Sequence, residues 1–178
     1  MIHPGMPIVT PEPVDFPTAA RRWLKTRPHK VRPDHQLDSL VVCYEQACAA
    51  TGVSLELAIT QMVHETDSYT SLWAQPPRRN PAGMGVTGTI LPDGQPAGQW
   101  FDTDALGVTA HIGRLLAYLL PAGEGSGPQR RFVDYCLTHQ PKPPRAVATT
   151  VAEMAAVWAA DPDYVSKLTA RHAQIAAA

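Results

Sequence analysis

One segment constrains the fold of this chain more than any other: the amphipathic run at residues 54–64 (SLELAITQMVH), which is followed by an acidic residue, Glu65. Its apolar residues recur at helical spacing, and Ser54 is a residue type that favours the N-cap of a helix. The polar residues 66–71 and the loop-forming residues 75–85 (QPPRRNPAGMG) cannot continue a buried helix. We therefore expect a helix that carries a partly buried carboxyl to the edge of a cleft. Partial burial favours the protonated form of such a carboxyl, which can then donate a proton near neutral pH.

The size and charge of the chain define the class of protein. With 178 residues it is long enough for one domain, and 44% apolar with 17% charged residues is typical of a globular protein. A formal net charge of -1 lacks the basic excess that attracts nucleic acid, so we expect no nucleic-acid partner. The longest apolar stretch, residues 108–120, is interrupted by His111 and Arg114 and is shorter than the ~20 residues that span a bilayer. We expect no membrane insertion, and a monomer.

The N-terminal region differs in composition from the rest of the chain. Residues 1–13 (MIHPGMPIVTPEP) have neither the basic start nor the apolar centre of a secretory signal, so export would need another route. The first 36 residues contain seven prolines, which predicts an extended Pro-rich arm with one short helix at residues 18–25. Residues 37–178 are then expected to form a single domain.

The remaining pattern predicts a mostly α fold (α+β). Residues 83–101 contain short β-prone runs on either side of the turn residues 92–94 (PDG), which predicts a small β-hairpin lobe. A substrate cleft is expected between this lobe and the helices. The other helices are predicted at residues 38–50, 105–120, 129–139, 151–160 and 163–176.

The cysteine and histidine positions argue against a disulfide or a metal site. The chain has three cysteines, Cys43, Cys48 and Cys136, which we interpret as small buried hydrophobes. The pair His64-Glu65 matches the start of a zinc-protease motif, but that motif needs a second histidine where this chain has Ser68. We therefore expect neither a metal nor a cofactor.

Three segments, in order, resemble the N-acetylglucosaminidase domains of bacterial and phage cell-wall hydrolases, which share the lysozyme-like fold. Residues 58–70 (AITQMVHETDSYT) are similar to the helix that delivers the catalytic glutamate of that family. Residues 80–85 (NPAGMG) are similar to its Asn-x-x-Gly-hydrophobic turn before the β lobe. Residues 158–168 (WAADPDYVSKL) are similar to its closing Tyr-Ala-Thr-Asp-Pro-x-Tyr segment.

The chain departs from the family pattern at three positions. Asp67 stands where a glycine is usual, Trp158 where the first tyrosine is usual, and Ala160 where a threonine is usual. The first position bears on the geometry of the acid, and the second on a tyrosine that the family uses near its site. These departures keep open a non-catalytic peptidoglycan-binding module on the same fold, since fold does not fix function.

The resemblance implies a glycoside hydrolase that cleaves the glycan strand of peptidoglycan after N-acetylglucosamine. It would act at the bacterial cell wall, after secretion or release by phage lysis. Glu65 would be the general acid, and Asp102 or Asp104 would be the second carboxylate that glycosidases normally need. Asp104 could instead cap a helix. A substrate with a 2-acetamido group can also supply its own nucleophile.

Side chains near the expected cleft would bind the sugars. The apolar faces of sugars stack on aromatic rings, although core packing is the alternative for each ring. Asn80 would touch the acetamido group or shape its own turn. A muramidase and a lytic transglycosylase are the enzyme alternatives, because both also depend on one such glutamate. The candidate aromatic side chains are Tyr69, Trp73, Trp158 and Tyr164.

Overall fold

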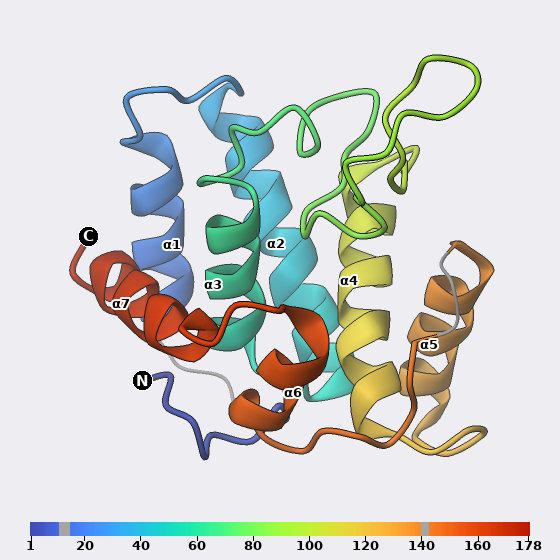
Figure 1. Ribbon diagram of the computed structural model, residues 1–178. Coiled ribbons are helices and arrows are strands. Elements are labelled where there is room, and N and C mark those ends of the chain that lie inside the picture. The colour runs from blue at the N-terminus through green and yellow to red at the C-terminus, as the bar shows by residue number, and fades with distance from the viewer. Residues whose placement is uncertain (11–14, 140–142) are drawn as a thin grey trace.

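The computed structural model describes residues 1–10, 15–139 and 143–178, and this part of the chain forms a mostly α-helical domain with seven helices (Figure 1). The predicted helices are confirmed, each to within about one turn at its ends. No helix in the described ranges combines the length and the hydropathy needed to cross a bilayer. The helices are α1 (Phe16–Lys25), α2 (Asp34–Thr51), α3 (Leu55–Glu65), α4 (Asp104–Leu119), α5 (Gly127–His139), α6 (Val151–Trp158) and α7 (Tyr164–Ala176).

Helix α3 is the buried centre of the domain and packs against α2 and α7 (Figure 1). All of residues 57–63 are buried, and a helix that is buried on every side needs neighbours around its whole circumference. Its start is fixed by Ser54, whose side chain accepts a hydrogen bond from the Leu57 N–H at 3.2 Å. Helix α2 ends just before it at Gly52, which has a left-handed φ of 78° that favours glycine. This short junction sets the point at which α3 begins.

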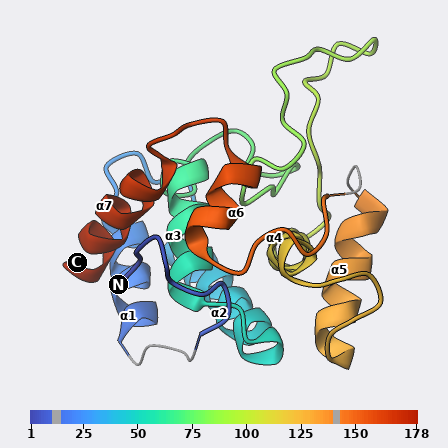
Figure 2. The same cartoon turned by 60° about the horizontal axis from the view of Figure 1, so that its bottom comes forward.

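The N-terminal segment packs into the same core as the helices. Ile2 and Ile8 are fully buried. The N–H of Ile8 donates to the Thr149 carbonyl at 3.0 Å, and the Ile8 carbonyl accepts from the Ser54 N–H at 2.8 Å. Figure 2 shows this segment running past α3. It therefore joins the start of α3 to the chain that leads into α6.

The predicted β-hairpin lobe is not seen, so this part of the fold prediction is wrong. Residues 83–101 form a long loop that projects from the helices (Figures 1 and 2). Within this fully described segment the only β-bridge is an isolated one between Ile90 and Pro96. Prolines cannot donate to a strand ladder, and Ile90, at 63% exposed, has no core to pack on. The predicted turn is present, because the Gly94 N–H donates to the Leu91 carbonyl at 2.9 Å.

The cysteines are free thiols, as expected for a chain without a disulfide frame. Cys48 and Cys136 are buried, which confirms their interpretation as small hydrophobes, whereas Cys43 is only half-buried. Burial raises the pKa of the Cys136 thiol to about 11, so this group stays protonated near neutral pH. The two buried thiols therefore act in the core as small apolar side chains.

Helices α4 and α5 approach closely because α4 carries glycine where they meet. A Cβ atom built on Gly113 would lie 2.1 Å from the carbonyl oxygen of Phe132 on α5, which is closer than any van der Waals contact. Backbone atoms cannot swing aside as a flexible side chain can. The separation of the two helices therefore depends on the absence of a side chain at this position.

We expect Gly113→Ala to lower the free energy of unfolding by about 1–3 kcal/mol, because the two helices must move apart to admit the methyl group. Urea unfolding of the variant and the parent measures this difference. Gly5→Ala is the matched control, since its Cβ would meet nothing closer than His3 at 3.8 Å. Equal stability of Gly113→Ala and the parent would contradict the close packing of α4 on α5.

Candidate active site

Glu65 lies at the C-terminal end of α3, where its partly exposed side chain lines a pocket of about 300 Å³. The other lining residues are 82–86, Arg114 and Trp158. A Cβ atom built on Gly83 would lie 4.0 Å from Oε2 of Glu65, so this oxygen faces the wall formed by residues 82–86. Helix α3 thus carries the carboxyl to the edge of a concave site.

The second carboxyl oxygen of Glu65 is held by two donors. The indole Nε1 of Trp158 donates to Oε1 at 3.0 Å, and the hydroxyl of Tyr164 donates to the same atom at 2.5 Å. Trp158 ends α6 and Tyr164 begins α7, so one corner of the chain supplies both contacts. Because two donors fix Oε1, the carboxyl group has a defined orientation, with Oε2 toward the pocket.

Tyr164 is itself held from behind by Gln61, which lies one helical turn before Glu65 on α3. Gln61 is fully buried, and its Nε2 donates to the Tyr164 hydroxyl at 2.9 Å. Burial, together with the neighbouring carboxyl of Glu65, raises the pKa of Tyr164 well above the usual tyrosine range. Tyr164 therefore remains a neutral hydroxyl that can donate to Glu65.

The turn that follows Glu65 has an unusual backbone. Asp67, Ser68 and Tyr69 have φ values of 47°, 61° and 66°, all in the left-handed region. At position 67 the resembling family has glycine, which adopts this conformation without strain. Aspartate is one of the few other residues that tolerate it. Ser68 is further fixed by accepting a hydrogen bond from Nε1 of Trp23 at 3.1 Å. The chain thus forms a left-handed turn directly after Glu65, with an aspartate at its first position.

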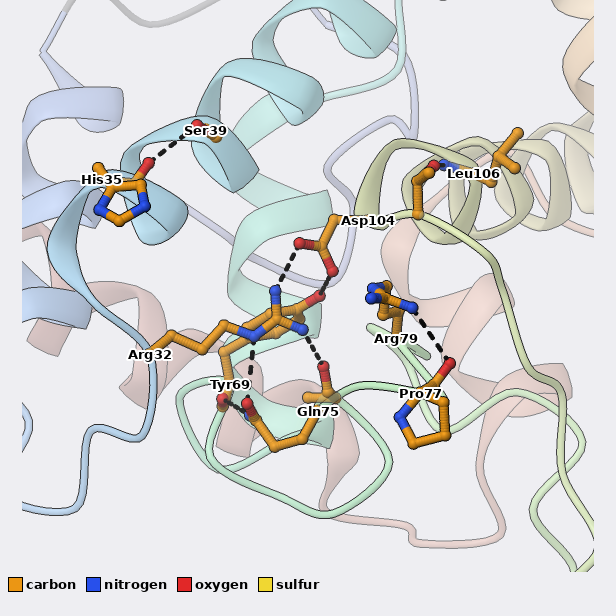
Figure 3. Close-up of polar contacts among 11 residues, drawn as sticks. Arg32, His35, Ser39, Tyr69, Gln75, Pro77, Arg79, Asp104 and Leu106 are labelled. Carbon is orange, nitrogen blue, oxygen red and sulfur yellow. Dashed lines mark hydrogen bonds and ion pairs between the residues drawn. The ribbon is translucent and has the colours of Figure 1, made fainter.

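Asp104 and Tyr69 lie in a second polar cluster (Figure 3). The guanidinium of Arg32 pairs with Asp104 at 2.5 Å, and the Tyr69 hydroxyl donates to the other Asp104 oxygen at 2.8 Å. Gln75 accepts from Arg32 and donates to the Tyr69 carbonyl. Neither Asp104 nor Tyr69 is among the residues that line the Glu65 pocket. The cap of α4 is Thr103 rather than Asp104, because its side chain accepts from the Leu106 N–H.

The other predicted site residues lie in the segment between α3 and α4. Asn80 is fully buried, and its side-chain amide donates to the Met84 and Gln99 carbonyls at 2.8 and 3.1 Å. Both amide hydrogens are thereby used in shaping the loop. Trp73 is half-buried, and Asp102 is exposed at the approach to α4. The Arg78 guanidinium lies 5.2 Å from the ring centroids of both Trp73 and Trp100.

Three residues that the sequence did not single out belong to the site or to its support. Arg114 lines the pocket, with its guanidinium 5.6 Å from the Trp158 ring centroid. Gln61 and His111 stand behind Tyr164, and His111 Nε2 lies 2.9 Å from Gln61 Oε1. A usable signal existed, because polar residues inside apolar helices are expected to have hydrogen-bond partners.

In the described ranges, no group of three or more His, Cys, Asp or Glu side chains could hold a metal ion.

No family model matches the chain, and neither the curated proteins nor the solved structures compared with it contain a match. The chemistry of the site is therefore inferred from its geometry and from the three resembling segments.

His111 links the site to the pH dependence of stability. It is fully buried, and loss of solvation, aided by Arg114, lowers its pKa to about 3. In an unfolded chain its pKa returns to roughly 6.5. Between these two pH values the unfolded chain binds a proton that the folded protein does not bind. The contribution of His111 to stability is thus complete above pH 6.5 and declines as the pH falls toward 3.

We expect the stability difference between the parent and His111→Gln to shrink by about 3 kcal/mol between pH 6.5 and pH 4, at ~1.4 kcal/mol per pH unit. Urea unfolding of both proteins at several pH values measures it, and the other titrating groups cancel in the difference. Parallel stability curves for the two proteins would show that His111 takes up its proton equally in both states.

Proposed function

We propose that this protein is a peptidoglycan hydrolase of lysozyme-like fold that cleaves the glycan strand after N-acetylglucosamine, with Glu65 as general acid. The observation that carries the proposal is the convergence of the three resembling segments on one pocket. The first supplies Glu65, the second supplies the wall at residues 82–85, and the third supplies Trp158 and Tyr164. Segments that are distant in sequence and meet around one carboxyl are what a shared active site requires.

The geometry of Glu65 suits proton donation. A general acid must present its proton at a fixed position near the leaving oxygen. Oε1 is held by two donors, while Oε2 faces the pocket. Arg114 adds one cationic group to the same pocket. The site therefore has one oxygen for orientation and one for chemistry.

The pocket favours a mechanism in which the substrate supplies the nucleophile. Among the described residues that line it, Glu65 is the only carboxylate. Asp102 and Asp104 are not among the lining residues. Glu65 Oε2 gives its proton to the bridging oxygen as the bond from C1 to that oxygen breaks, and the acetamido oxygen bonds to C1. Water then attacks C1 and breaks the bond to the acetamido oxygen, and its proton returns to Glu65. The reaction needs no metal or cofactor.

The setting of this activity follows from its substrate. Peptidoglycan glycan strands are the proposed partner, so the protein would act at the bacterial cell wall after secretion or phage lysis. One protomer contains all the residues of the proposed site, so the reaction can be carried out by a monomer.

We expect Glu65→Gln to reduce the rate of turbidity loss of purified sacculi by 10²–10⁴-fold, because the amide keeps the size of the side chain but has no acidic proton to give. Glu124→Gln, at an exposed loop position, is the matched control and should keep full activity. Thermal unfolding of each variant tests that the fold is intact. A Glu65→Gln protein within threefold of the parent would remove Glu65 from the mechanism.

A second candidate is a lytic transglycosylase, which the same observation of a single pocket carboxylate favours. A muramidase is the remaining enzyme alternative. Mass spectrometry of the released fragments separates the three activities. We expect reducing N-acetylglucosamine ends. Reducing muramic ends would indicate a muramidase, and anhydro-muramic ends a transglycosylase. Binding to sacculi without any released fragment would instead indicate a non-catalytic module.

A further inference from the structure

A line of buried side chains runs from Glu65 into the core of the domain. Behind Tyr164 and Gln61 it continues to His111 on α4, whose Nε2 lies 2.9 Å from Gln61 Oε1. It ends on α2 at Tyr44, whose hydroxyl lies 2.9 Å from His111 Nδ1. Gln61, His111 and Tyr44 are all 0% exposed, so no water competes for these contacts. Through Tyr164, His111 and Tyr44, helices α7, α4 and α2 are thereby connected to Oε1 of Glu65.

The direction of every hydrogen bond in this line follows from Glu65. The indole of Trp158 can only donate, so Oε1 is an acceptor, and the Tyr164 hydroxyl gives its single proton to that atom. Tyr164 must then accept from the Gln61 NH₂ group, which leaves the Gln61 oxygen facing His111. The proton of His111 therefore lies on Nε2, and its Nδ1 accepts from Tyr44.

We propose that Gln61, His111 and Tyr44 are positioning residues, which keep the Tyr164 hydroxyl directed at Oε1 and so keep the exchangeable proton of Glu65 on Oε2, facing the pocket. A proton on Oε1 would occupy one of the two lone-pair sites that Trp158 and Tyr164 use and would displace one of these donors, whereas a proton on Oε2 displaces none of the contacts described. Bonds that point the same way polarise and strengthen one another. The role in catalysis rests on the proposed function, but the direction of the bonds does not.

The surroundings of His111 maintain this direction. Tyr44 from α2, Gln61 from α3 and the Trp158 ring from α6, at 5.6 Å, face it, and none of these carries a charge. The charged neighbour that acts on it is Arg114, which disfavours an imidazolium. A protonated His111 would donate from both nitrogens, and Tyr44 would have to reverse its hydroxyl. The neutral state therefore preserves the whole line.

The test begins at Tyr44, the residue of this line that is most remote from the pocket. We expect Tyr44→Phe to lower kcat on sacculi or soluble glycan strands about fivefold, with KM within twofold of the parent, because one directing hydrogen bond is lost. Val41→Ala, at a buried apolar position on the same helix, is the control for loss of stability alone and should keep the parental kcat. An unchanged kcat in Tyr44→Phe, or an equal loss in both variants, would overturn the positioning role.

Nitrogen-15 NMR of histidine-labelled protein tests the direction without any substrate. The spectrum of His111→Gln identifies the His111 signals among those of the seven histidines. We expect a neutral His111 protonated on Nε2 in the parent, and a loss of this preference in Tyr44→Phe. A proton on Nδ1 in the parent would overturn the proposed direction. A parent protein that cleaves no glycan would refute the proposed function and the catalytic role of the line, while the NMR result would still decide its direction.

Discussion

The pair of hydrogen bonds to Oε1 of Glu65 is the interaction on which the site depends. Its donors, Trp158 and Tyr164, lie 93 and 99 residues further along the chain than the acceptor. Helix α3 alone would leave its last carboxyl free to rotate in solvent. The corner between α6 and α7 fixes the carboxyl and, through the Trp158 ring, also forms one wall of the pocket.

The N-terminal segment helps to position these parts. Its backbone pairs with Thr150 next to α6 and with Val53 just before α3. The two elements that meet at Glu65 are thus joined near their starts by the same short stretch of chain. Because Ile2 and Ile8 are fully buried in the core, this stretch contributes hydrophobic stabilisation as well as hydrogen bonds.

The loop between α3 and α4 is held by polar contacts rather than by a sheet. The ion pair of Arg32 with Asp104 and the hydrogen bond from Tyr69 fix its two ends (Figure 3). Asn80 fixes the turn that leads into residues 82–86 of the pocket wall. Residues that a sequence pattern assigns to the sugar, such as Tyr69 and Asn80, here satisfy the backbone and side-chain groups of the loop. Buried polar groups must find such partners, and a loop of this length has many.

The sequence by itself determined the helices, because apolar period and capping residues act over a few neighbouring positions, as Ser54 and Gly52 do at the start of α3. It also placed Glu65 at a helix end. It overestimated the strands at residues 83–101, because β-prone runs form strands only when a partner and a core face are available. The partners of Glu65, the burial of Asn80 and the line from Tyr44 through His111 were decided by the tertiary structure alone. Each of these joins residues far apart in the chain, and only the packing of helices α2, α3, α4, α6 and α7 determines which polar groups meet.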